Sequence, residues 1–295
     1  MADTARRNAV LLLALLSLIW SYNWIVMKQA LRYSGPFEFA AWRCALGACV
    51  LFAVLAWRRK LRPPRLAPVV AIGLAQTLGF TALVQLALVE GGAGKTALLS
   101  YTMPFWAVLV AWLVLHERPS RVQAASLAIA FAGLVLVLEP WHGVGALTPS
   151  LLAIAGGLAW SIGMVLSKRA FVRERFDPLV LTAWQMLVGA IGLVVVAACV
   201  HERAIDWSGG FIAALAYNAV LASGLAWLLW AWVVERLPTA VAGLSSLAIP
   251  MLGVLLAWAV LGERPSASEA AGIVVVGCAL AMVSLRGSRR QRPAG

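Results

Sequence analysis

Long apolar runs alternate with short polar segments along almost the whole chain. Each run is close to the roughly 20 residues that a helix needs to cross a bilayer. No run sustains a strict alternation of apolar and polar residues, so the pattern predicts helices rather than barrel strands. We expect ten spans, at about 9–31, 37–57, 67–89, 93–115, 121–138, 149–170, 178–200, 209–234, 239–261 and 267–285.

The composition is that of an integral membrane protein. Of the 295 residues, 62% are hydrophobic and 12% are charged, whereas a soluble domain carries about 25% charge. The net charge of +12 lies in short loops between apolar runs, which excludes a nucleic-acid surface. The three histidines are scattered and no metal-ligand spacing is present. We therefore expect a lipid environment, no metal, no cofactor and no enzymatic activity.

The basic residues predict an orientation. With the N-terminus in the cytoplasm, 18 of the 24 Lys and Arg residues fall in cytoplasmic segments. The positive-inside rule then places both termini in the cytoplasm. Arg43 is the one basic residue that lies within a span and not in its last few residues or in a loop. We expect its head to snorkel to the outer interface, and anion binding is the weaker alternative.

Two parts of the chain repeat each other. Residues 116–120 read His-Glu-Arg-Pro-Ser and residues 262–266 read Gly-Glu-Arg-Pro-Ser, an offset of 146 positions (262 minus 116). The halves, 1–140 and 141–295, would each hold five spans. Because five is odd, the second half would begin on the opposite side of the membrane from the first, and the two halves would have inverted topologies. Such inverted repeats place a substrate site near the bilayer midplane. The alternative is a duplicated scaffold that transports nothing.

The Glu-Arg-Pro-Ser copies are interpreted mainly as turns. Ser120 with Gln123, and Ser266 with Glu269, fit the capping-box spacing at a helix N-terminus. A structural role is therefore preferred over a functional one for both copies.

Paired prolines give a candidate hinge and a candidate site. Pro104 and Pro250 are related by the same offset, and each lies about halfway along an apolar run. Proline lacks an N–H and displaces the carbonyl four residues earlier, here that of Ser100 or Ser246. We expect these carbonyls and hydroxyls to be available at the membrane centre, with Pro104 and Pro250 as gating hinges. A plain kink is the alternative.

Polar and aromatic residues inside the spans complete the candidate site. Intramembrane polar groups face the bundle interior, where they either line a cavity or only bind helices together. Deep indole rings suit a ligand with an apolar body or a cationic head, although ordinary core packing explains them equally well. The candidates are Trp20, Asn23, Thr81, Gln85, Trp160 and Trp227. No carboxylate lies at the centre of a span, which favours facilitated transport or exchange over proton coupling.

The ten spans, the inverted halves and the Glu-Arg-Pro signature resemble the drug/metabolite transporter superfamily, EamA type, over nearly the whole chain. Among its members, the chain is most similar to bacterial amino-acid exporters of the YddG type. The resemblance implies a monomer in the bacterial inner membrane that exports aromatic and other neutral amino acids by alternating access around a central cavity. It also adds Tyr101 to the small-molecule site. A multidrug or quaternary-amine exporter, and a non-transporting receptor or scaffold, stay open as alternatives.

Overall fold

The computed structural model is a helical bundle. The structure describes residues 2–116, 120–142, 147–174, 176–227, 229 and 239–287, and the side chains of 2–10, 115, 142, 172–174, 239–247 and 283–287 fall outside that description. Every regular element within the described residues is helical. The prediction of an all-α fold is therefore confirmed, while the count of ten spans and the orientation stay predictions.

The first half of the described chain ends with α7. Its elements are α1 (Ala2–Ala30), α2 (Pro36–Trp57), α3 (Leu66–Ile72), the π-helix η1 (Gly73–Gly79), α4 (Phe80–Glu90), α5 (Ala93–Ser100), α6 (Met103–Leu115) and α7 (Arg121–Leu138). The second half follows a short 3-10 turn, η2 (Pro140–His142). Its elements are α8 (Thr148–Glu174), α9 (Pro178–Cys199), α10 (Gly209–Ala216), the π-helix η4 (Tyr217–Leu225), α12 (Thr239–Leu256), the π-helix η5 (Ala257–Leu261) and α13 (Ala267–Gly287).

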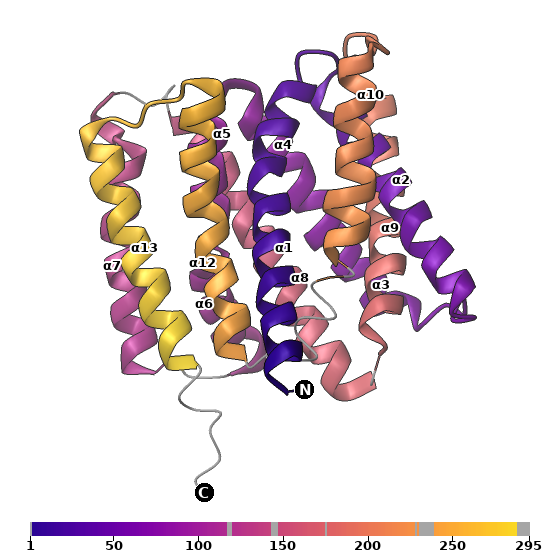
Figure 1. Ribbon diagram of the computed structural model, residues 1–295, viewed down its shortest axis with the longest axis horizontal. Coiled ribbons are helices and arrows are strands. Elements are labelled where there is room, and N and C mark those ends of the chain that lie inside the picture. Colours follow the sequence, from indigo (N-terminus) through magenta and orange to yellow (C-terminus); the bar gives the residue numbers. More distant parts are fainter. Residues whose placement is uncertain are drawn as a thin grey trace, which may run out of the picture.

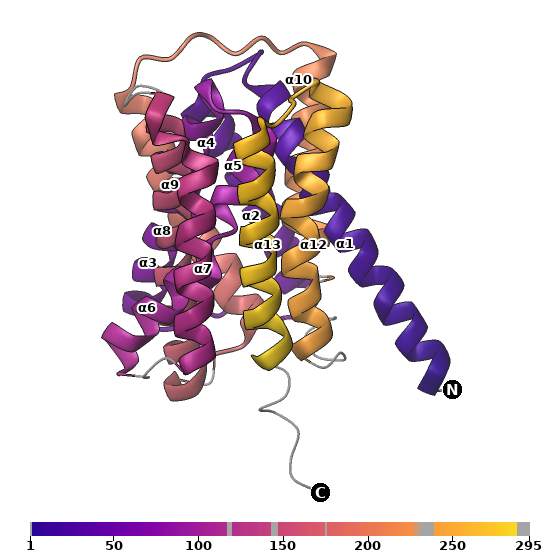
Figure 2. The ribbon, with the colours of Figure 1, turned by 90° about the vertical axis from the view of Figure 1, so that its left-hand side faces the viewer.

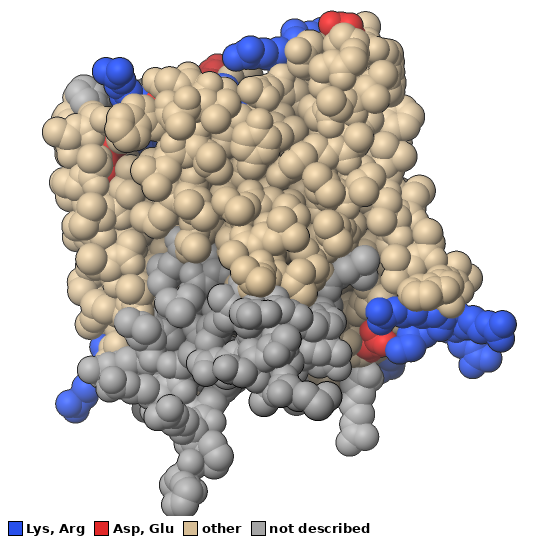
Figure 3. Space-filling model, viewed as in Figure 1, with Lys and Arg blue, Asp and Glu red and all other residues tan. Residues whose placement is uncertain are grey.

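Among the residues that the structure describes, seven helical segments are long and apolar enough to cross a membrane: Leu11–Ala30, Pro36–Trp57, Leu66–Glu90, Ala93–Val114, Arg121–Leu138, Thr148–Phe171 and Pro178–Cys199. Shorter apolar helices cover Gly209–Leu225, Ala248–Leu261 and Ala267–Met282. On the described part of one face, acidic and basic side chains gather near the two ends of the bundle, and the belt between them is uncharged (Figure 3). This distribution fits a multi-pass membrane protein.

The helices run side by side along one direction, with α7 and α13 at one edge of the bundle (Figure 1). The start of α1 and the end of α13 lie at the same end of the bundle (Figure 1). Toward its N-terminus α1 leans away from the other helices (Figure 2). Exposed leucines such as Leu11 and Leu18 cover this outlying part, as expected for a surface in contact with lipid tails.

The contacts between helices show an exchange pattern. α2 packs on α9, and α7 packs on α13. α1 packs on α12 and η4, just as α8 packs on α6 and η1. η4 lies against α2, just as η1 lies against α9. The elements α1, α2, η1, α6 and α7 of the first half correspond to α8, α9, η4, α12 and α13 of the second half. When each element is replaced by its counterpart, every one of these contacts becomes a contact of the same set.

The paired prolines are placed differently from the prediction. α5 ends at Ser100, a turn at Tyr101 and Thr102 follows, and Pro104 occupies the first turn of the new helix α6. Pro104 therefore does not bend a continuous helix, because in the first turn its missing N–H has no helical partner to lose. Pro250 lies inside the continuous helix α12. The two prolines share a sequence offset but not a local geometry.

Candidate functional site

Aromatic side chains from four separate helical segments meet in the bundle. The Trp160 and Trp227 rings are stacked, with centroids 6.0 Å apart and planes at 26°. Trp20 meets Trp227 edge to face at 5.8 Å, and Phe80 meets Trp160 at 4.8 Å. These four residues form the aromatic cluster. It unites three residues that the sequence nominated, and Phe80 is the one that sequence reasoning missed.

A hydrogen bond fixes Trp20 of the aromatic cluster to a backbone carbonyl. The Trp20 indole N–H donates to the Ala222 carbonyl at 3.1 Å, and Ala222 belongs to the π-helix η4. In the same region the Tyr217 hydroxyl donates to the Ile19 carbonyl at 2.7 Å. The π-helical turn widens the local helix and displaces carbonyls from their regular α-helical positions. The π-helical geometry of η4 thereby explains why the Ala222 carbonyl can accept a hydrogen bond from the Trp20 indole of α1.

A second group of side chains is polar and buried. Asn23 on α1 and Gln85 on α4 are 9% and 0% exposed. The Asn23 Oδ1 atom and both amide atoms of Gln85 are buried without a hydrogen-bond partner. Thr81, one turn before Gln85, is also buried and lies within hydrogen-bonding reach of the Cys44 thiol. Buried polar groups are rarely left unpaired in proteins, so Asn23 and Gln85 stand out.

Arg43 belongs to the same interior region, and the prediction that it snorkels to the interface is wrong. Its Nη1 donates to the Asn218 Oδ1 atom at 3.1 Å and contacts the Met27 sulfur. Asn218 lies in η4, 175 positions after Arg43, so the pairing of these two residues could not be predicted from the sequence. A charged side chain turns inward when the interior supplies a hydrogen-bond partner. We call Asn23, Arg43, Gln85 and Asn218 the polar cluster.

The other residues that the sequence predicted for the site do not all lie in the aromatic or the polar cluster. Tyr101 sits at the break between α5 and α6, and its ring meets that of Trp24 at 6.3 Å. The Ser100 hydroxyl donates to the Ala153 carbonyl at 3.5 Å. A Cβ on Gly157 would lie 2.7 Å from the Ser100 carbonyl, so this carbonyl faces α8 at close range. The side chain of Ser246 lies outside the described residues.

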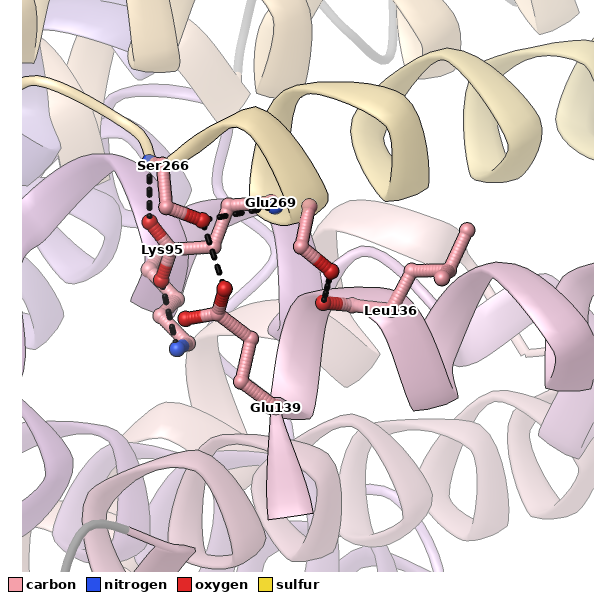
Figure 4. Close-up of polar contacts among 6 residues, drawn as sticks. Lys95, Leu136, Glu139, Ser266 and Glu269 are labelled. Atoms are coloured by element: carbon pink, nitrogen blue, oxygen red, sulfur yellow. Dashed lines mark hydrogen bonds and ion pairs between the residues drawn. The ribbon is translucent and has the colours of Figure 1, made fainter. Parts of the chain in front are cut away.

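The second Glu-Arg-Pro-Ser copy joins three helices at one end of the bundle. Its capping box is confirmed, since the Glu269 amide donates to the Ser266 hydroxyl and the Ser266 amide donates to the Glu269 carboxylate. The Ser266 hydroxyl also donates to Glu139 at 2.6 Å, and Lys95 pairs with Glu269 at 2.6 Å (Figure 4). These contacts fasten the start of α13 to α5 and to the end of α7.

Glu263 of the same copy caps another helix. Its two carboxylate oxygens accept from the Ala93 and Gly94 amides at 2.8 and 3.0 Å, at the N-terminus of α5. The glycine-rich stretch that opens α5 thus binds an anion that the chain itself supplies. Beside it lies a pocket of about 280 Å³. Lys95, Glu263 and Glu269 line this pocket but already have partners. The pocket and the aromatic cluster share no residue.

The chain matches a known family along most of its length. The model of the EamA-like transporter family matches it twice, over residues 7–139 and 147–285. The two matched stretches cover both halves of the bundle described above.

Several proteins of known sequence are similar to this chain from end to end. An uncharacterized transporter of Bacillus subtilis, YoaV, is 25% identical over 93% of this chain and 96% of its own length. A probable amino-acid metabolite efflux pump of Salmonella typhimurium is 25% identical over 98% of each chain. A protein of that same description from Escherichia coli is 25% identical over 92% of this chain and 93% of its own length.

One solved crystal structure has the same fold. It superposes with a TM-score of 0.68 over 98% of this chain and 99% of its own, at 22% identity. At this level of identity the likeness concerns the arrangement of helices alone.

Proposed function

Since the chain belongs to the EamA-like transporter family, we propose that this membrane transporter exports aromatic and other neutral amino acids. Two relatives are described as probable amino-acid metabolite efflux pumps, which supports this substrate class. The observation that carries the proposal is the aromatic cluster, in which Trp20, Trp160 and Trp227 from both halves of the bundle meet. Their faces and edges suit an apolar or aromatic side chain.

The polar cluster would take the charged head of the same molecule. Asn23 and Gln85 hold buried amide atoms that lack partners, and such atoms gain free energy when a ligand supplies the missing hydrogen bonds. Tyr101, at the nearby break between α5 and α6, adds a hydroxyl group. Thr81 and Ser246 are further proposed contacts, and Ser100 is the weaker member because its hydroxyl already donates to Ala153.

The proposed mechanism is alternating access by rocking of two inverted five-helix halves, 1–140 and 141–295. The exchange pattern of helix contacts supports it, because equivalent contacts in the two halves permit two arrangements of similar energy that are related by a pseudo-two-fold rotation. The rings of the aromatic cluster touch one another, so a substrate must separate them to pass. The turn at Tyr101 and Thr102 beside Pro104, and Pro250 in α12, are the proposed hinges.

The proposed setting is the bacterial inner membrane, with a monomeric protein and both termini in the cytoplasm. The excess of basic residues in the segments assigned to the cytoplasm supports this orientation. The exposed basic run that includes Arg58, Arg59 and Arg62, after α2, is the largest single contribution. The end of the bundle that holds Glu263 would then face outward.

Efflux from proteoliposomes tests the proposal. We expect vesicles loaded with L-phenylalanine or L-leucine to release it faster than protein-free vesicles. Trp160→Ala should slow release about two- to tenfold, in line with the loss of one aromatic contact. Trp57→Ala is the matched control, since Trp57 ends α2 and is 83% exposed. Wild-type rates in both Trp160→Ala and Ser246→Ala would show that the site is assigned wrongly.

A quaternary-amine exporter is the second candidate. The stacked pair of Trp160 and Trp227 favours it, because indole faces attract cations. Competition separates the two candidates: tetraethylammonium should not slow leucine efflux if the site recognises amino acids. Efflux of tetraethylammonium without efflux of any amino acid would replace the first proposal by the second. Flux that never exceeds that of protein-free vesicles would favour a receptor or scaffold.

A further inference from the structure

We propose that Arg43 holds the carboxylate of the transported molecule, so that the substrate class is an amphipathic carboxylate such as an α-amino acid. The inference rests on the proposed function and adds a recognition element to it. It assigns the carboxylate of the substrate to the Arg43 guanidinium, which lies in the part of the bundle near the start of α2.

Arg43 is a partly buried cation, and no residue that the structure describes supplies it with a fixed counter-charge. It lies seven residues after the start of α2 at Pro36, about 10 Å along the helix. Its Nη1 donates to the neutral amide oxygen of Asn218, and its Nε is buried without a partner. No carboxylate of the described residues forms an ion pair with it. A charged group at this depth is costly and marks a binding or transport role.

Other unpartnered atoms lie at the same level. Asn23 stands seven residues before the end of α1, and Gln85 five residues before the end of α4. At 1.5 Å per residue these positions lie about 7–10 Å from the helix ends on the side where α2 begins. α4 packs against both α1 and α2, and Arg43 of α2 touches Met27 of α1, one turn after Asn23. Buried, unsatisfied amide atoms therefore lie on the helices that surround the cation.

The donors and acceptors of this region complement a zwitterion. A guanidinium N–H donates to a carboxylate in a charge-assisted hydrogen bond. The amide oxygens of Asn23 and Gln85 accept from an ammonium group, and both lack a donor. An α-amino acid carries both charges on one carbon, so a single ligand would satisfy all three side chains. Its apolar side chain would extend toward the aromatic cluster, whose Trp20 lies about one turn before Asn23 on α1.

The competing explanation is that Arg43 only ties α2 to η4 through Asn218. That bond alone needs one neutral donor, which a glutamine or asparagine would supply without burying a charge. The two explanations differ in one observable property. A ligand-binding arginine discriminates between molecules with and without a carboxylate, whereas a purely structural arginine does not.

Three ligands that share one apolar side chain and differ in their charged groups test whether the protein recognises the carboxylate. L-leucine carries both charges, 4-methylpentanoate carries the carboxylate alone, and L-leucinamide carries the ammonium alone. Binding to the purified full chain is followed by its tryptophan fluorescence, which requires no transport. We expect wild type to bind leucine best, 4-methylpentanoate next and leucinamide least.

Variants then assign the discrimination to Arg43. Arg43→Gln should raise the Kd of leucine and 4-methylpentanoate about tenfold or more, the effect of losing one charge-assisted bond, and leave leucinamide unchanged. Arg43→Lys should keep part of the preference. Asn218→Asp would place a fixed carboxylate beside the guanidinium and should abolish carboxylate binding in a chain that folds at least as well. Arg32→Gln is the matched control, because Arg32 is exposed and follows α1 at the same end of the bundle.

The results separate the inference from the proposed function. Equal affinity for leucine and leucinamide in wild type, or an unchanged preference in both Arg43→Gln and Asn218→Asp, overturns the inference even when amino acids are transported. Carboxylate-selective binding that depends on Arg43 sustains the inference even when proteoliposomes show no efflux, and in that case the proposed function fails. A wild-type chain that binds none of the three ligands overturns the inference as well.

Discussion

Ser21 on α1 and Ser161 on α8 make the same pair of contacts in the two halves of the molecule. The Ser21 hydroxyl lies 2.6 Å from the Ser17 carbonyl and 3.0 Å from that of Ile249. The Ser161 hydroxyl lies 2.7 Å from each of the Gly157 and Met103 carbonyls. Ile249 and Met103 each precede a paired proline. Each serine therefore joins the first helix of its own half to the proline-containing segment of the other half.

We expect these two serines to contribute equally to stability. Ser21→Ala and Ser161→Ala should each lower the free energy of unfolding by about 0.6 kcal/mol, the usual contribution of one hydrogen bond between membrane helices. Ser17→Ala is the matched control, because its buried hydroxyl bonds only within α1, to Leu13. Unfolding in mixed detergent micelles measures the difference. An effect at only one of the two serines would contradict the equivalence.

Glu263 should stabilise the helix that it caps. Glu263→Ala removes both acceptors from the first turn of α5 and should cost about 1 kcal/mol, as for other lost N-caps. Glu90→Ala removes the same charge near the same end of the bundle from an exposed residue and should leave the unfolding curve in place. The capping interpretation fails if both variants shift the curve equally.

The ion pair between Lys60 and Asp177 predicts a pH dependence. Burial alone would raise the pKa of the Asp177 carboxyl, but hydrogen bonds from Lys60 and from the Leu179 amide outweigh it and hold this pKa below its ordinary value. Because the folded state lowers this pKa, the ion pair stabilises the protein at higher pH. The stabilisation is complete above the ordinary carboxyl pKa of about 4 and is lost as the pH falls through the lower, folded-state pKa.

The expected size of this effect is small. The two side chains are 52% and 33% exposed, so the pair contributes below about 1 kcal/mol after screening by solvent. Unfolding measured between pH 6 and pH 3 should therefore show slightly more acid sensitivity in wild type than in Asp177→Asn. Identical pH profiles for the two proteins would mean that the pair contributes nothing.

Gly189 should tolerate no larger side chain. A Cβ at this position of α9 would lie 2.2 Å from the Thr77 Cβ in η1, where the Thr77 hydroxyl donates to the Gln185 side chain at 2.6 Å. Gly189→Ala should therefore destabilise the protein by about 1–3 kcal/mol, the usual cost of overpacking. Gly209→Ala provides the control, since nothing lies within 4 Å of its Cβ position. Equal unfolding midpoints in the two variants would contradict this packing.

The sequence predicted the features that depend on local pattern. The apolar runs predicted helices because each helix satisfies its own backbone in lipid. The spacing of Ser120 to Gln123 and of Ser266 to Glu269 predicted two capping boxes, and both are present. The residue numbers of Trp20, Trp160 and Trp227 also predicted positions away from the ends of their spans, since depth along a helix follows from residue number.

Tertiary structure decided which groups meet across the bundle. The Arg43 guanidinium turned inward because Asn218 offers it an acceptor from a distant segment. The contact of Glu263 with the start of α5, and that of Phe80 with Trp160, likewise depend on how the helices pack. Helical periodicity gives the face and depth of each residue but not the rotation and offset of one helix against another. The partners of polar and aromatic side chains are consequently known only once the helices are assembled.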